Sequence, residues 1–188
     1  AHSRRILLET GDAKKRATGI EVDIATSGTQ IIRARREVIL SAGAIGSPQL
    51  LQLSGIGPPE LLQALGVPIT HEVAGVGENL HDHLQVRMVY QVENTITLNQ
   101  RANSLLGKAA MGLEYLFMKT GPLTMPPSQL GAFAKSDADQ LSANIEWHVQ
   151  PLSLDKFGDP LHSFNAITPS VCNLRPTSRG HLHIKTPD

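Results

Sequence analysis

The stretch SAGAIGSPQLLQLSGIGPPELLQALGV, residues 41–67, combines a glycine-rich turn with two leucine-rich segments. The run that leads into it, residues 37–41, is short, apolar and rich in β-branched residues, which is typical of a strand buried on both faces of a parallel sheet. Ser47 and Pro48 are residue types that begin a helix, and a second helix is predicted to begin at Pro58. The stretch therefore predicts a strand, a tight turn and two short helices.

The glycines of the turn allow two interpretations. The segment GAIG at residues 43–46 is not G-x-G-x-x-G, and no Gly-Lys-Ser/Thr follows it as in a P-loop. Glycine can simply provide the backbone freedom that a tight strand-to-helix turn requires. It can also let the backbone approach a ligand, with the helix N-terminus offering N–H donors to an anion or a sugar. The turn alone leaves both interpretations open.

Composition and charge are typical of a globular protein. Of the 188 residues, 40% are hydrophobic and 18% charged, and 17 basic residues balance 17 acidic ones. The chain has neither the basic excess that indicates nucleic-acid binding nor an apolar run of about 18 residues that a membrane helix needs. The single cysteine, Cys172, excludes an internal disulfide and fits a reduced, cytoplasmic compartment. Both ends lie in strand-like runs, so we expect an internal piece of a longer protein.

The rest of the chain predicts a strand-rich first part and a mixed second part. The predicted strands are 5–9, 19–26, 30–33, 84–92, 131–135, 144–152, 164–174 and 181–185, and the one long helix is 104–119. The first three strands are expected to be antiparallel, and antiparallel strands with helical cover form an α+β layer. We therefore predict an α/β plus α+β chain with two domains, residues 1–83 and 84–188.

The loop that ends the first part carries three polar candidates, Asn79, Asp82 and His83. An Asp next to a His could orient it as a base, or both could bind a metal ion. Asn and Asp also hydrogen-bond to backbone in loops, and we favour this structural interpretation for Asn79 and Asp82. In that case His83 packs between the two domains without taking part in chemistry.

The predicted strand 144–152 carries a second group of polar candidates. Alternation places Glu146, His148 and Gln150 on one face of this strand and Trp147 on the other. We expect the Trp147 face to belong to the core, so that the polar face is either solvated or the wall of a substrate cavity. A carboxylate in such a wall could attract a cationic substrate such as an amino alcohol.

The other histidines and the cysteine predict no metal site. His181 and His183 share one face of a predicted strand, but no third ligand is evident. His162 is expected at the surface or in packing. Cys172 lies in an apolar strand and is expected to be a small core side chain rather than a nucleophile.

Several segments together resemble one known family. GAIGSPQLLQLSGIG at residues 43–57 is similar to the second signature of the glucose–methanol–choline (GMC) oxidoreductases, which are FAD-dependent alcohol oxidases and dehydrogenases. The supporting segments are ATGIEV at 17–22, REVILSAG at 36–43, GVGENLHDH at 75–83, GPL at 121–123 and SRG at 178–180. The resemblance is dense over residues 17–83 and thin but colinear beyond them, and it is closest to choline-dehydrogenase-like members.

The resemblance implies a role for each part of the chain. Residues 1–83 would be part of an FAD/NAD(P)-binding-type domain, with a β-meander and a central strand at 37–41. Residues 84–188 would be part of a substrate-binding domain whose antiparallel sheet covers the flavin ring.

The resemblance also implies site residues. Ser3 would lie where the backbone meets the adenine of FAD. Ala42 and Gly43 would lie where a strand end approaches the adenosine, and Asn79 would lie in a loop beside the cofactor. Glu146 and His148 would then line the substrate cavity, and no residue of this chain is expected to be catalytic.

The sequence departs from the family pattern at both ends. It lacks the N-terminal G-x-G-x-x-G fingerprint and the C-terminal segment with the active-site histidine. The complete protein is therefore expected to transfer a hydride from a small-molecule alcohol to flavin, whereas this chain alone is expected neither to catalyse nor to retain FAD. The alternative is a stand-alone, non-catalytic binding or structural module derived from such an enzyme. Either way, open sheet edges would favour self-association, and neither nucleic acid nor a membrane is an expected partner.

Overall fold

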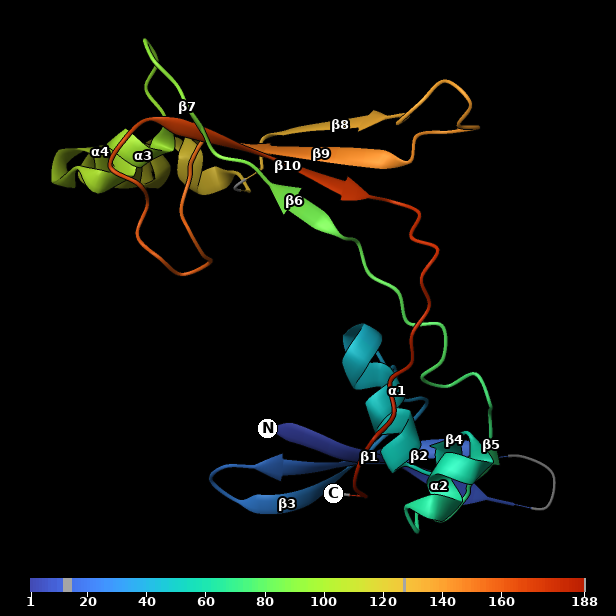
Figure 1. Ribbon diagram of the computed structural model, residues 1–188. Helices are drawn as coiled ribbons and strands as arrows, with labels where there is room; N and C mark the ends of the chain where they lie inside the picture. The colour runs from blue at the N-terminus through green and yellow to red at the C-terminus, as the bar shows by residue number, and fades with distance from the viewer. Residues whose placement is uncertain (12–14, 127, 188) are drawn as a thin grey trace. The chain divides into compact units, whose positions relative to one another are not determined.

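The computed structural model describes residues 1–11, 15–126 and 128–187, and its helices and strands are labelled in Figure 1. The chain forms two compact units, which are described separately below. Unit 1 contains residues 1–81 and 178–188, and unit 2 contains residues 82–177. None of the helices within the described residues has the length and apolar character needed to cross a membrane.

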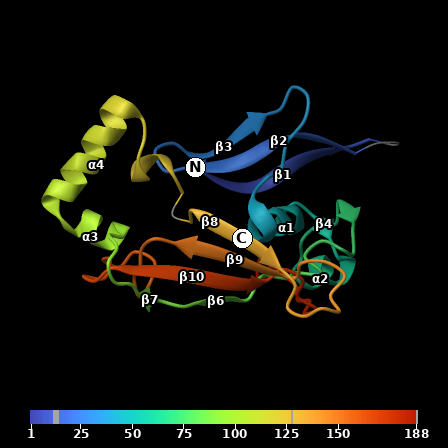
Figure 2. The same ribbon diagram turned by 90° about the horizontal axis from the view of Figure 1, so that it is seen from above.

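Unit 1 begins with a three-stranded antiparallel meander, which confirms the prediction for this part of the chain. The strands are β1 (His2–Thr10), β2 (Lys15–Ile24) and β3 (Gly28–Arg33), in the spatial order β1-β2-β3 (Figure 2). Ile6 and Val22 point into the core of the unit and are buried. On the more exposed face, Arg5 pairs with Glu21 at 2.8 Å, since the two residues lie opposite each other in the β1–β2 register.

The segment that joins the meander to the first helix is not a strand. Residues 37–41 were predicted as a central strand of a parallel sheet, and this prediction is wrong for the structure. The described residues contain no strand paired with this segment, and Ile39 is 80% exposed. A parallel strand needs neighbours to accept its backbone hydrogen bonds, and an apolar run cannot show by itself whether those neighbours exist.

Helix α1 (Gly43–Leu53) begins five residues earlier than predicted, because Ser47 was expected as the N-cap and Ala42 takes that position. The hydroxyl of Ser47 accepts a hydrogen bond from the backbone N–H of Ala42 at 3.1 Å, so Ser47 stabilises the entry of the helix from within the first turns rather than as its N-cap. Pro48 consequently lies inside the helix. Gly43 starts the helix with a φ of +79°, a conformation that favours glycine, so the turn does require it.

The small core of unit 1 forms around the second helix, α2 (Pro59–Ala64). Two short parallel strands, β4 (Ile56–Gly57) and β5 (His71–Glu72), flank this helix in the chain. The buried apolar side chains are Leu62, Val67 and Ile184, with Leu53, Leu65 and Ile69 packed against them.

The side chain of Gln52 ties three segments of unit 1 together. It is fully buried on α1, and its Nε2 donates to the carbonyl oxygens of Val76 at 3.2 Å and Leu182 at 2.9 Å. Its Oε1 accepts from the backbone N–H of Ile184 at 2.9 Å. These bonds hold residues 182–184 against α1, so the strand predicted at 181–185 does not form and the segment has side-chain partners instead.

Unit 2 is an antiparallel sheet with helices, as the sequence predicts. The strands are β6 (Gln85–Arg87), β7 (Tyr90–Gln91), β8 (Leu130–Ala134), β9 (Ile145–Gln150) and β10 (Ala166–Asn173), in the order β6-β10-β9-β8 with β7 also paired to β10. The helices are α3 (Leu98–Asn103), α4 (Leu105–Met118) and the short η1 (Pro122–Thr124).

Helix α4 confirms the predicted helix at 104–119 and shows why it has these ends. The hydroxyl of Ser104 accepts from the backbone N–H of Gly107 at 3.3 Å and caps the N-terminus. Lys119 ends the helix in the left-handed conformation, with a φ of 55°. Much of the apolar side of the helix is exposed, and Phe117 is 82% exposed.

The expectation that the Trp147 face of β9 belongs to the core stays a prediction, because all six residues of β9 are half-buried. In the β9–β10 register, Glu146, His148 and Gln150 lie opposite Cys172, Ser170 and Thr168. Those three β10 residues are buried, whereas Val171, opposite Trp147, is only half-buried. On β10, the residues opposite the polar side chains of β9 are therefore more buried than the residue opposite Trp147.

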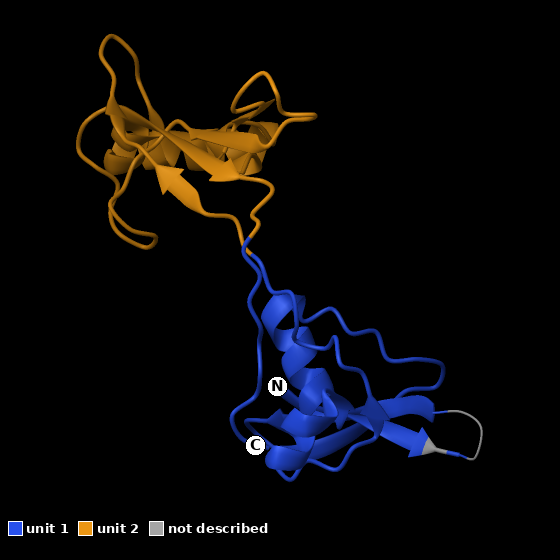
Figure 3. Ribbon diagram, turned by 45° about the vertical axis from the view of Figure 1, so that its right-hand side comes forward, with its two compact units in different colours: residues 1–81, 178–188 blue, residues 82–177 orange. Residues whose placement is uncertain are grey.

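The division into units lies close to the predicted domain boundary in one place and departs from it in another. The chain leaves unit 1 after residue 81, near the predicted boundary at 83, and returns to it at residue 178 (Figure 3). The return depends on the bridge between Leu80 and Gly180, whose backbone groups exchange two hydrogen bonds at 2.9 and 2.7 Å. Such long-range pairing has no local signal in the sequence.

Candidate functional site

Unit 1 contains a pocket of about 460 Å³ between the start of β1, the segment before α1, and α1 itself. It is lined by Ala1, His2, Ser3, Ile20, Val38, Ile39, Leu40, Ser41, Ala42, Gly46, Gln49, Leu50 and Leu53. The walls are mainly aliphatic, and backbone and hydroxyl groups of Ser3 and Ser41 add polar groups. A pocket of this size and character can hold a flat heteroaromatic ring with an attached sugar.

A second, more polar hollow of about 390 Å³ shares Ser3 and Gln49 with the first pocket. Its wall includes Arg4 and Arg5, which pair with the acidic side chains of β2. The distances are 3.5 Å from Arg4 to Asp23 and 2.8 Å from Arg5 to Glu21. A ligand in the first pocket could therefore extend from an aliphatic chamber toward charged groups.

The structure brings two of the four predicted cofactor-side residues together. Ser3 and Ala42 line the same pocket, although they are far apart in the chain. Gly43 follows Ala42 directly but is not among the lining residues, and a Cβ added to it would meet nothing within 4 Å. Its role in the structure is conformational.

Asn79 does not join the pocket residues. It is exposed in the loop after β5 and adopts the left-handed conformation with a φ of 59°. Its carbonyl oxygen lies 3.1 Å from Nδ1 of His81. The neighbouring Asp82 accepts from the backbone N–H of His83 at 2.8 Å, so the capping interpretation holds for this carboxylate.

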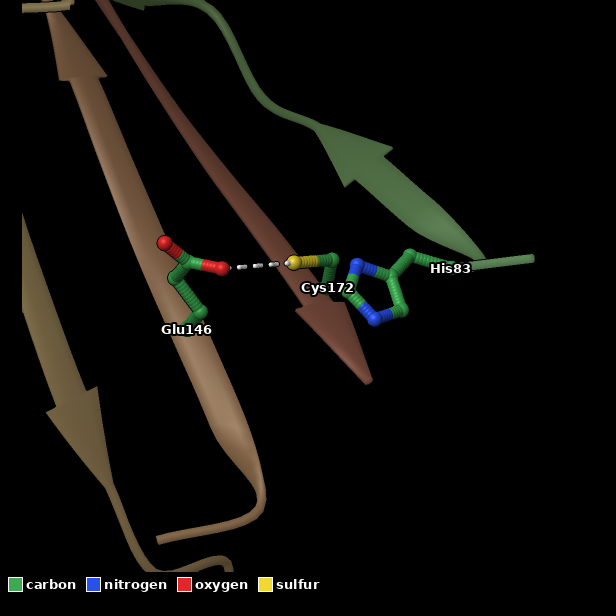
Figure 4. Close-up of side chains that lie close together, drawn as sticks. All are labelled: His83, Glu146 and Cys172. Carbon is green, nitrogen blue, oxygen red and sulfur yellow. Dashed lines mark hydrogen bonds between the residues drawn. The ribbon is translucent and has the colours of Figure 1, made fainter. Parts of the chain in front are cut away.

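In unit 2 the predicted substrate-side residues Glu146 and His148 lie together on β9. Nε2 of His148 is 3.2 Å from Oε1 of Glu146, and the Glu146 side chain is 19% exposed. The other carboxylate oxygen, Oε2, accepts from the thiol of Cys172 at 3.7 Å. His83 lies beside Glu146 and Cys172, as Figure 4 shows. This polar group occupies the face of the sheet that carries the buried Cys172.

The surroundings of Cys172 favour its protonated form. Burial, and secondly the adjacent Glu146 carboxylate, raise the pKa of the Cys172 thiol. A raised pKa favours the protonated thiol, which is a poor nucleophile.

A buried polar network that the sequence does not predict holds the loop after β9. Asn99 and Ser153 are fully buried, and the Asn99 amide group contacts the backbone of Ser153 and His162 at 3.1 and 3.0 Å. Oγ of Ser153 lies 2.9 Å from Nδ1 of His162, and Nε2 of that ring lies 3.2 Å from Asp155. A Ser-His-Asp chain usually suggests acyl transfer, but a fully buried hydroxyl cannot meet a substrate, so this network positions a loop.

The comparisons with known proteins agree on one family. The model of the GMC oxidoreductases matches residues 1–85, which include Ser3, Ala42, Gly43 and Asn79. The oxygen-dependent choline dehydrogenase of Photobacterium profundum is 36% identical over 99% of this chain, and that of Cronobacter sakazakii is 37% identical over 100%. This chain covers 32% and 33% of those two proteins, so it spans about a third of their length.

Solved structures show the same fold. A formate oxidase is similar with a TM-score of 0.79 and 24% identity, and the similarity covers 100% of this chain and 37% of that protein. A pyridoxine 4-oxidase from Mesorbium loti gives a TM-score of 0.66 at 25% identity, covering 99% of this chain and 31% of its own. Together with the family-model match and the sequence relatives, these structures show that residues 1–85 match the N-terminal domain of the GMC oxidoreductases and that the chain as a whole is similar to members of that family.

Proposed function

We propose that the complete protein is an FAD-dependent oxidoreductase acting on the CH–OH group of a small-molecule alcohol. The observation that carries the proposal is the pocket shared by Ser3 and Ala42, inside the region that matches the family model. A formate oxidase of Aspergillus oryzae with the same fold is described with a modified FAD. The chemistry that FAD supplies when bound is the acceptance of a hydride from the alcohol carbon.

We infer that the pocket of unit 1 receives the adenine side of FAD, because the family resemblance assigns Ser3 and Ala42 to that side and both residues line the pocket. Its aliphatic lining, which includes Ile20 and Leu40, can contact a flat base, and Ser3 offers hydrogen-bonding groups. The exposed Ile39 beside it leaves apolar surface for a ligand or another segment to cover. This chain would therefore bind the nucleotide end weakly by itself and would not retain FAD through gel filtration.

In unit 2, Glu146 and His148 would belong to the substrate side of the protein. The sequence relatives are choline dehydrogenases, and choline is an alcohol with a quaternary ammonium group. A half-buried carboxylate attracts such a cation more strongly than a solvated one, because the surrounding protein screens its charge less than water does. We therefore propose that Glu146 favours a cationic alcohol over a neutral one.

The substrate proposal can be tested in the complete protein with Glu146→Gln, which keeps the shape of the side chain and removes its charge. We expect KM for choline to rise about tenfold, which corresponds to roughly 1.4 kcal/mol, while KM for a neutral alcohol of similar size stays the same. Glu93→Gln, at an exposed carboxylate of the same unit, is the matched control. Equal effects of Glu146→Gln on both alcohols would refute the proposed selectivity.

The second candidate is a stand-alone, non-catalytic module derived from such an enzyme. It differs from the first in one measurable property, because a module would have no flavin-dependent oxidation of alcohols in its natural full-length form. Purification of the protein from its source, followed by its flavin spectrum and alcohol-dependent bleaching of that spectrum, separates the two. Bleaching supports the enzyme, and a colourless protein supports the module.

A further inference from the structure

The Cys172 face of the unit 2 sheet carries three different metal-ligating side chains in one place. Among the described residues, a nitrogen of His83, a carboxylate oxygen of Glu146 and Sγ of Cys172 all lie within 4.8 Å of one another. Figure 4 shows Sγ of Cys172 directed toward the Glu146 carboxylate, with the His83 ring beside the Cys172 side chain. Imidazole, carboxylate and thiolate are all ligands of Zn²⁺ in proteins.

The sheet register holds these residues in place. Glu146 and Cys172 lie directly opposite each other on β9 and β10, so their side chains share a face. Gln85 of β6 lies opposite Cys172, and His83 precedes Gln85 by two residues, which keeps it on that face. The N–H of Asn173 donates to the carbonyl of Leu84 at 3.3 Å and fixes the segment that carries His83.

The distances suit a tetrahedral ion after a small adjustment. Bond lengths of about 2.0–2.3 Å to N, O and S place tetrahedral ligand atoms roughly 3.3–3.8 Å apart. The ligand atoms now lie within 4.8 Å of one another, and rotation of side chains can shorten these distances. His83 is exposed, and the Glu146 side chain has several rotatable bonds. Cys172 is 4% exposed and would be the fixed ligand.

His148 provides the outer contact that bound carboxylates usually have. Its Nε2 lies 3.2 Å from Oε1 of Glu146, which leaves Oε2 directed toward Cys172. Groups in this outer position orient the ligand and affect metal affinity. The arrangement therefore has three ligands and one orienting contact, and the fourth coordination position remains open to water.

We propose that His83, Glu146 and Cys172 bind a divalent cation of the Zn²⁺ class. On binding, the ion replaces the thiol proton of Cys172, which passes to solvent, and the S–H bond is exchanged for a metal–sulfur bond. The thiolate and the carboxylate then balance the two positive charges of the ion. No oxidation or reduction is involved.

This site is independent of the flavin proposal. Because the cationic alcohol and the metal ion would both use the Glu146 carboxylate, they would exclude each other there. Metal binding by the 188-residue chain is measured without flavin or alcohol, so the two proposals can fail separately.

The test uses Co²⁺ as a spectroscopic probe for Zn²⁺. Titration of the chain with Co²⁺ is expected to produce a thiolate-to-cobalt charge-transfer band in the near ultraviolet that saturates at one ion per chain, and Zn²⁺ is expected to abolish it. Cys172→Ser should remove the band. Glu146→Gln leaves the Cys172 ligand in place and should weaken Co²⁺ binding at least tenfold. His148→Gln removes the orienting contact to Glu146 and should weaken Co²⁺ binding by about tenfold.

The matched control is His181→Gln. The rings of His181 and His183 lie 4.5 Å apart between centroids and are tilted by 31°, and His183 lies 2.8 Å from Glu78, so these residues of unit 1 offer a rival, thiol-free binding place. His181→Gln should leave the charge-transfer band unchanged. Far-ultraviolet circular dichroism of each variant verifies folding. A band that persists in Cys172→Ser, or an affinity that Glu146→Gln leaves unchanged in the folded chain, would overturn the proposal.

Discussion

At the scale of single residues, Gln52 shows how a signature segment serves the fold. The sequence identifies the segment 43–57 through a family resemblance, but the resemblance does not say that Gln52 is buried or what it binds. The structure gives its amide three backbone partners in two distant segments. A polar side chain in a leucine-rich helix is therefore the link between residues 76 and 182–184.

We predict that Gln52→Leu destabilises the chain by on the order of 3 kcal/mol, because it leaves the buried N–H of Ile184 and two carbonyl oxygens without this partner. Urea unfolding followed by circular dichroism measures the change. The control is Gln63→Leu on α2, where the side chain is exposed, and a change within about 0.5 kcal/mol is expected there. Equal destabilisation by the two variants would contradict the role given to Gln52.

The family resemblance, and not the residue types alone, predicted part of the candidate site. It implied that Ser3 and Ala42 lie near one ligand, and the two residues line one pocket. Asn99 and Ser153 carried no signal, because an Asn in a short helix and a Ser in a loop are ordinary surface residues until folding buries them. The group of His83, Glu146 and Cys172 was missed because three strands bring together residues that are distant in the chain.

At the scale of elements, periodicity predicted the antiparallel strands and α4 but not the surroundings of each element. Residues 37–41 have the composition of a buried strand and remain unpaired in the structure. On β9 the alternation was recognised, but all six of its residues are half-buried, so the alternation alone does not identify the core face. Alternation divides a strand into two faces, and only the neighbouring strands decide which face is covered.

The loop after β9 should depend on Asn99 more than on the other asparagine of α3. We predict that Asn99→Ala speeds amide hydrogen exchange at Ser153 by at least tenfold, because Oδ1 of Asn99 accepts from that N–H at 2.8 Å in a buried place. The amide of His162, which bonds to the Ser153 carbonyl at 3.0 Å, should exchange faster as well.

The matched control is Asn103→Ala. Asn103 contacts the same loop, with Nδ2 3.0 Å from the carbonyl oxygen of His162, but its side chain is exposed and water can replace it. Exchange at Ser153 is expected to change little in this variant. If both variants accelerate exchange equally, the buried network does not hold the loop.

At the scale of the whole molecule, much apolar surface is exposed within each unit. On α4, Leu105 is 84% and Leu116 62% exposed, and on the edge strand β3, Ile31 is 55% exposed. Such surfaces and unpaired edges favour association. We predict that the isolated chain self-associates, so that its mass from light scattering rises with concentration. A mass equal to one chain at all concentrations would contradict this prediction.

The proposed function depends most directly on binding of the adenine end of FAD in the pocket of unit 1. The most direct measurement adds AMP and, separately, FMN to the isotope-labelled chain and follows the amide resonances by NMR, because these two molecules are the halves of FAD. We predict saturable shifts with AMP at Ser3, Ile20, Ala42 and Gly46, and none there with FMN. Ala42→Leu should weaken the AMP response, and Ala64→Leu, at an exposed position of α2, should not. No response of these residues to AMP, or an equal response to FMN, would contradict the claim.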